Sequence, residues 1–117
     1  MTHPAARPKL LKLSDSEFRL EDRVSDIRGM GVFNRDGEQM GSVEDFYVDT
    51  EERKVRFLEV GAGGFLGLGE KRFLIPVEDV TDFREGGVTV EQNREVSEPP
   101  PLNMRIVPQA TAERDDN

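Results

Sequence analysis

The stretch that decides the fold reads Asn34-Arg35-Asp36-Gly37-Glu38-Gln39-Met40-Gly41-Ser42-Val43-Glu44-Asp45-Phe46-Tyr47-Val48-Asp49. Its Asp36-Gly37 dipeptide supplies the positive φ angle that a tight hairpin turn requires, which predicts an antiparallel strand on either side. Phe46 and Val48 alternate onto one face of the returning strand, whereas Val43 is out of phase with them. A β-bulge near Glu44-Asp45 would bring the three side chains onto the same face.

Outward from this hairpin, the pattern predicts further strands. Residues 54–60 carry apolar side chains on both faces, which is typical of a central strand covered on each side. In the next strand Phe73, Ile75 and Val77 alternate and Leu74 lies opposite them. Pro76 has no N–H for a strand ladder, so this strand is expected to end or to reach a sheet edge there.

One or two short helical turns are expected, and three places fit them. Residues 14–17 have the spacing of a capping box, although a polar stretch without a turn fits equally well. A second turn is expected at residues 24–27, before Gly29. Residues 76–83 fit a third, with Val80 and Phe83 on one face. Gly86-Gly87 then opens a last strand, whose Val88 and Val90 point inward.

The predicted fold class is all-β, a small antiparallel β-barrel of about five or six short strands with one or two helical turns. Residues 1–19 are expected to form a flexible N-terminal arm, residues 20–96 the barrel, and residues 97–117 a Pro-rich linker and flexible tail. The alternative for residues 104–107 is an extra edge strand.

Composition narrows the classes of function. The 117 residues carry a formal charge of −8 and no cysteine, so disulfides, thiolate nucleophiles and Cys-ligated zinc are excluded. An acidic surface disfavours nucleic acid and favours a basic protein partner. No stretch approaches the roughly 20 apolar residues of a membrane span. A soluble, cytoplasmic, bacterial protein is expected.

Several elements agree with one known family: Asp36-Gly37-Glu38, Gly41, Val43-Glu44-Asp45, Val48-Asp49, Val55, Phe57-Leu58, Val60, Gly63-Gly64-Phe65-Leu66-Gly67, Gly69-Glu70-Lys71 and Leu74-Ile75-Pro76. In this order and over residues 20–96 the chain resembles the PRC-barrel family. That family includes the cytoplasmic domain of the photosynthetic reaction-centre H subunit and the C-terminal barrel of a ribosome-maturation factor. Residues 1–19 are expected to form neither the membrane anchor of the former nor the large preceding domain of the latter. The resemblance implies a stand-alone barrel that forms homodimers rather than one that catalyses a reaction.

The acidic residues suggest a cation site only weakly. Asn34, Asp36, Glu38 and Asp45 loosely follow an EF-hand loop, but Gln39 occupies the position that requires Gly. A second acidic group could gather a divalent cation or pass protons, although an exposed acidic turn is the better interpretation: Glu44, Asp45, Asp49, Glu51 and Glu52.

Catalytic and nucleotide-binding motifs fail at the residues that their chemistry needs. Residues 64–69 have the spacing of a P-loop, but Glu70 stands where the motif requires lysine, and no hydroxyl residue follows it. His3 is the only histidine, and Ser42 has no identifiable base. No enzymatic activity, metal or cofactor is expected.

The interface candidates are the apolar residues of the two least regular segments: Phe65, Leu66, Leu68, Met104 and Ile106. The first three lie among glycines and would either plug the barrel or form an exposed patch. We therefore expect a non-catalytic interaction or assembly module that self-associates. The alternatives are a ribosome-maturation or RNA-processing adaptor that binds a basic protein, and a weak metal or small-ligand sensor.

Overall fold

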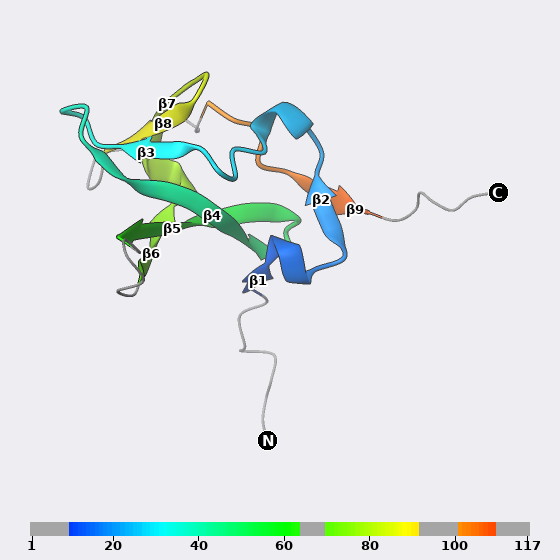
Figure 1. Cartoon of the computed structure of the whole chain (residues 1–117). Helices are drawn as coiled ribbons and strands as arrows, with labels where there is room; N and C mark the ends of the chain where they lie inside the picture. The colour runs from blue at the N-terminus through cyan, green and yellow to red at the C-terminus, as the bar shows by residue number, and fades with distance from the viewer. Residues whose placement is uncertain (1–9, 64–69, 92–100, 110–117) are drawn as a thin grey trace.

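The hairpin that anchors the fold joins strand β3 (Gly31–Phe33) to strand β4 (Gln39–Asp49). The computed structural model describes residues 10–63, 70–91 and 101–109 (Figure 1). Gly37 has a φ angle of +86°. The side-chain oxygen of Asn34 accepts hydrogen bonds from the backbone N–H groups of Asp36 and Glu38, each 2.9 Å long. The predicted turn at Asp36-Gly37 is confirmed.

Strand β5 (Lys54–Gly63) runs antiparallel along most of β4. Their register shifts between Val43 and Asp45, which leaves Glu44 as the extra residue of a β-bulge. Val43 and Phe46 consequently share the buried face of β4, with 2% and 0% of their surface exposed. The predicted bulge is therefore confirmed. The predicted central position of residues 54–60 is confirmed, because β5 lies between β4 and β6. The expected cover on each side is not, because core residues pack on only one side of β5.

The remaining strands extend this pair into one large sheet (Figure 1). They are β1 (Leu10–Lys12), β6 (Glu70–Pro76), β7 (Val80–Arg84) and β8 (Gly87–Val90). The strand order is β6-β5-β4-β3-β8-β7, and β1 pairs with β4. All neighbouring strands are antiparallel except β3 and β8, which are parallel.

The all-β class is confirmed, but the sheet differs from a closed antiparallel barrel. Among the described residues β6 and β7 are the two ends of the strand order and do not pair with each other. Pro76 offers no N–H at the end of β6, and the 3-10 turn η5 (Val77–Asp79) redirects the chain there. The parallel contact depends on small residues, because a Cβ atom on Gly87 would lie 2.6 Å from the Phe33 ring and 2.9 Å from the carbonyl oxygen of Gly31.

Two of the expected helical turns need correction. Only residues 77–79 of the turn predicted at 76–83 are helical, because Val80 and Phe83 pair with β8 as part of β7. No capping box forms at residues 14–17. A 3-10 turn, η2 (Leu13–Asp15), lies there instead, and the Ser14 hydroxyl donates to the carboxylate of Asp45 rather than to the backbone. The short turn before Gly29 is present as η3 (Arg23–Ser25).

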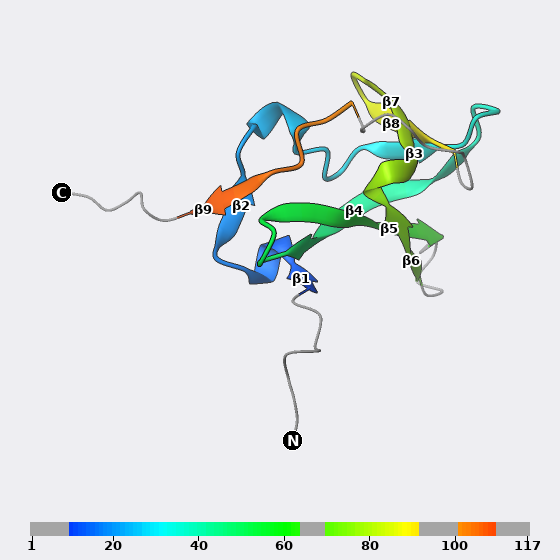
Figure 2. The same cartoon turned by 180° about the vertical axis from the view of Figure 1, so that it is seen from behind.

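The segments near the two ends of the chain form a second, small sheet. Strand β2 (Phe18–Leu20) pairs with β9 (Ile106–Pro108), and the two run side by side in both views (Figures 1 and 2). The N–H of Val55 donates to the carbonyl of Met104 at 2.8 Å, which ties this sheet to β5. Residues 10–19 and 101–109, assigned to the arm and the tail from the sequence, thus contribute strands and buried side chains.

The core lies on one side of the β4–β5–β6 sheet. It consists of aliphatic side chains and one large aromatic ring, that of Phe46. The segments at the two ends of the chain cover it with Leu13, Leu20, Leu102 and Ile106. No helix among the described residues is long and apolar enough to cross a membrane.

Candidate functional site

The side of β1, β4, β5 and β6 that faces away from the core is called the outer face below. Successive side chains of a strand point to opposite sides, so residues beside the buried Phe46, Leu58 and Ile75 lie on this face. The pairing registers arrange them in two rows. Lys12, Tyr47, Phe57 and Pro76 form one row, and Asp45, Glu59 and Leu74 form the other.

Two carboxylates lie directly opposite each other in this second row. Asp45 on β4 pairs in register with Glu59 on β5, and each residue is only 6% exposed. The bulge at Glu44 produces this register. Like charges at directly paired positions destabilise a sheet unless other groups compensate them. Each carboxylate accordingly has its own set of partners.

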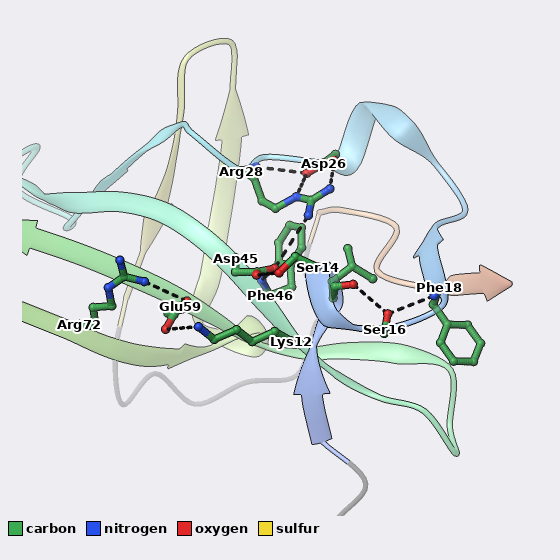
Figure 3. A network of polar contacts seen from close by, with 11 residues as sticks. Lys12, Ser14, Ser16, Phe18, Asp26, Arg28, Asp45, Phe46, Glu59 and Arg72 are labelled. Atoms are coloured by element: carbon green, nitrogen blue, oxygen red, sulfur yellow. Dashed lines mark hydrogen bonds and ion pairs between the residues drawn. The ribbon is translucent and has the colours of Figure 1, made fainter. Parts of the chain in front are cut away.

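Glu59 lies between two cations from different strands (Figure 3). The Lys12 ammonium is 3.6 Å from Oε2, and the Arg72 guanidinium is 3.5 Å from Oε1. Oε1 is nevertheless the one buried side-chain oxygen or nitrogen without a hydrogen bond in the described part of the chain. These contacts tie β1 and β6 to the central strand β5.

Asp45 is held by hydrogen bonds and by one cation that lies farther away. It accepts hydrogen bonds from the Ser14 hydroxyl and, at 2.7 Å, from the backbone N–H of Phe46. The Arg28 guanidinium lies 3.8 Å from its Oδ1 and 5.8 Å from the centre of the Phe46 ring. Asp45 thus connects the N-terminal turn η2 and the segment after η3 to β4 (Figure 3).

Arg28 is positioned in turn by Asp26. The guanidinium donates two hydrogen bonds, of 2.8 and 2.7 Å, to the two carboxylate oxygens. These hydrogen bonds lower the pKa of Asp26 below its ordinary value, although partial burial opposes the shift. The same contact raises the pKa of Arg28. A paired, planar guanidinium of this kind is a rigid anchor.

The outer face also carries an apolar group that we call the outer apolar group: Tyr47, Phe57 and Leu74. None of the three belongs to the core or is among the partly buried residues that pack against it. Leu74 is 46% exposed and lies on a regular strand beside Glu59. Tyr47 and Phe57 are half-buried, so the outer apolar group is a partly solvent-exposed surface on an ordered sheet.

This arrangement holds strands together and presents a surface. No cluster of three or more His, Cys, Asp or Glu residues with metal-site geometry occurs within residues 10–63, 70–91 and 101–109. Asp45 is engaged by Ser14 and Arg28, so it is not available to the loose EF-hand pattern suggested by the sequence.

A model of the PRC-barrel domain matches residues 20–96, which is more than half of the chain. The chain belongs to the PRC-barrel family. The resemblance noted from the sequence is thus confirmed, with the same residue range. No curated protein matches the chain.

The interface residues proposed from the sequence fall into two groups in this PRC-barrel protein. Met104 and Ile106 are 7% and 2% exposed and form part of the chain's own core, in and next to β9. Phe65, Leu66 and Leu68 lie outside the described residues, so their proposed role stays a prediction.

Sequence reasoning missed the outer apolar group, although signals for it are present. The alternation places Leu74 opposite Phe73 and Ile75, and the apolar residues on both faces of β5 indicate burial on both sides. The structure covers only the inner side with core residues. The sequence around Glu59 does not indicate that this carboxylate is buried between two cations, because Lys12 and Arg72 lie in other strands.

Proposed function

We propose that this PRC-barrel protein is a non-catalytic interaction module that self-associates through its outer face. The observation that carries the proposal is the outer apolar group, whose three residues lie on an ordered sheet without packing on the core. Two carboxylates are buried within this face, and their desolvation costs free energy that their partners must offset. The ion pairs and hydrogen bonds of these carboxylates hold the strands in place, so the face can keep its shape when a partner binds.

The size of the surface fits a modest association. Burying Leu74 and the exposed parts of Phe57 and Tyr47 would contribute on the order of 5 kcal/mol at about 25 cal/mol per Å². Association costs remove much of this gain. A second copy of the chain is therefore expected to bind reversibly.

Membership of the PRC-barrel family supports the coarser part of the proposal, since the family is generally one of small non-catalytic interaction domains. The absence of an identifiable nucleophile and base in the sequence agrees with it. The fold by itself does not specify the partner.

The proposal is tested by replacing Leu74 with Asp and measuring mass by size-exclusion chromatography with light scattering. The wild-type protein is expected to form dimers whose fraction rises with concentration, and Leu74→Asp is expected to be monomeric. Val24→Asp is the matched control, because Val24 is 70% exposed in η3, outside the outer face. A monomeric wild type, or equal masses for the two variants, would refute the proposal.

A further inference from the structure

The charged groups along β5 indicate how a second copy would lie on the outer face. At one end of the face, Glu52 in the β4–β5 turn has a side chain that is 57% exposed. At the other end, the side chain of Arg72 on β6 is 46% exposed. Two accessible charges of opposite sign thus lie on opposite sides of the outer apolar group.

Phe57 lies between these two charges at a similar spacing from each. Glu52 precedes Phe57 by five residues, and Arg72 pairs in register with Gly61, four residues beyond Phe57. The register between β4 and β5 shifts at Arg56, which is an extra residue in a bulge and shortens the first distance. The outer face thus carries opposite charges on the two sides of Phe57, at comparable offsets along the chain and its register.

A surface with this property is complementary to itself. In a two-fold dimer the same patch of both subunits meets, so that residue i contacts residue j of the other copy and the reverse contact also forms. A two-fold axis that lies parallel to the outer face and crosses β5 above Phe57 would bring Glu52 of each copy onto Arg72 of the other. The outer apolar groups would then cover each other.

The existing ion pairs of these residues permit such an exchange. Glu52 Oε1 lies 3.5 Å from the Lys54 ammonium and 3.6 Å from the Arg56 guanidinium, and Arg72 lies 3.5 Å from Glu59. All of these distances exceed those of short charge-assisted hydrogen bonds. The side chains are partly exposed, so they can contact a second copy while keeping their own partners.

We infer that the chain forms a two-fold symmetric dimer by stacking outer face on outer face, with reciprocal Glu52–Arg72 contacts around the outer apolar group. This inference rests on the proposed function and adds the orientation of the partner. The charge pairs would set the register of the dimer rather than supply most of its affinity.

Mixing two charge-reversal variants tests the inference. Glu52→Arg alone places two arginines together in both contacts, and Arg72→Glu alone places two glutamates together. Each variant is expected to self-associate about tenfold more weakly than wild type at low ionic strength. A mixture of the two variants relieves this repulsion in the mixed dimer, so heterodimers are expected to exceed the statistical fraction in native mass spectrometry.

Two further variants complete the experiment. The double variant Glu52→Arg/Arg72→Glu also loses the contact of Arg72 with Glu59, but it is expected to form more homodimer than either single variant, which shows that the substituted chains fold. Glu85→Arg carries the same charge change in the β7–β8 turn, away from the outer face, and its mixture with Arg72→Glu is expected to give no excess of heterodimers.

The outcomes separate this inference from the proposed function. If Leu74→Asp abolishes the dimer but the mixed variants show only the statistical fraction of heterodimers, the two-fold arrangement is wrong and self-association through the outer face stands. If the wild type is monomeric, or if Leu74→Asp leaves the dimer intact, both are wrong. An excess of heterodimers together with a dimeric double variant supports the arrangement.

Discussion

The two faces of the β4–β5 pair are built from the same strands but have opposite compositions. The inner face is entirely apolar, with side chains at most 2% exposed: Val43, Phe46, Val48, Val55, Leu58 and Val60. The outer face combines two buried carboxylates with the outer apolar group. The inner face is complete within one chain, whereas the outer face is held by charges from β1, β6 and the segment after η3. The first face therefore serves folding, and the second is the face that we propose for binding.

The largest effect is expected from the inner face. Phe46→Ala removes the largest fully buried side chain and leaves a cavity between the sheet and its covering segments. The free energy of unfolding is expected to fall by about 3–5 kcal/mol, a large fraction of the roughly 5–15 kcal/mol typical of a domain. Urea denaturation followed by circular dichroism measures the loss.

Tyr47→Ala is the matched comparison, because Tyr47 is the next residue along β4 and points to the outer face. It is expected to lower the free energy of unfolding by no more than about 1.5 kcal/mol, since its ring does not pack on the core. Equal losses for the two variants would show that the outer face is as much a part of the core as the inner face.

A smaller but still large effect is expected from the two cations around Glu59. The double variant Lys12→Met/Arg72→Met leaves a buried carboxylate without a compensating charge, and the expected loss is about 3 kcal/mol in urea denaturation. Adding Glu59→Leu is expected to recover most of the loss, because the uncompensated charge is then absent as well.

Lys54→Met/Arg56→Met provides the control for this prediction. It also removes two cations, but their shared partner Glu52 has an exposed side chain and keeps its hydration. The expected change is within about 0.5 kcal/mol. A control as destabilised as the Lys12 and Arg72 variant would mean that net charge, rather than the burial of Glu59, causes the effect.

The parts of the fold that local chemistry determines could be predicted from the sequence. The Asp36-Gly37 turn follows from the φ angle that Gly37 permits. The bulge at Glu44 follows from the phase difference between Val43 and Phe46, which share a face only if one residue is added. Each feature depends only on two strands that follow each other in the sequence, β3 and β4 for the turn and β4 and β5 for the bulge.

The parts that depend on distant contacts could not be predicted. The parallel contact of β3 with β8 requires Gly31 and Gly87 to meet beside Phe33, and no local pattern records that meeting. The outer face depends in the same way on Lys12 and Arg72, which reach Glu59 from two other strands. The apolar residues on both faces of β5 are visible in the sequence. Their pattern alone does not distinguish a strand buried on both sides from one with a core side and a partly exposed side.

The smallest effect is expected from the Asp26–Arg28 pair at the border of the outer face. The hydrogen bonds from Arg28 lower the pKa of the Asp26 carboxyl in the folded protein. The pair therefore stabilises the fold above the ordinary pKa of 3.8, and this stabilisation is lost as the pH falls through the lower pKa of the folded state. Both side chains are about one-third exposed, at 33% and 35%, so the contribution at pH 6 is expected to be only about 0.5 kcal/mol.

Asp26→Asn tests this because it removes the charge and keeps an acceptor for Arg28. The difference in the free energy of unfolding between wild type and variant is expected to be constant from pH 7 to about pH 5 and to shrink below about pH 4. Asp36→Asn in the exposed hairpin turn is the control, and its difference should show no comparable decline. If the Asp26→Asn difference were independent of pH, the carboxylate charge would not stabilise the fold. Arg28 would then be held near Asp45 by packing over the Phe46 ring, and the border of the outer face would be insensitive to acid.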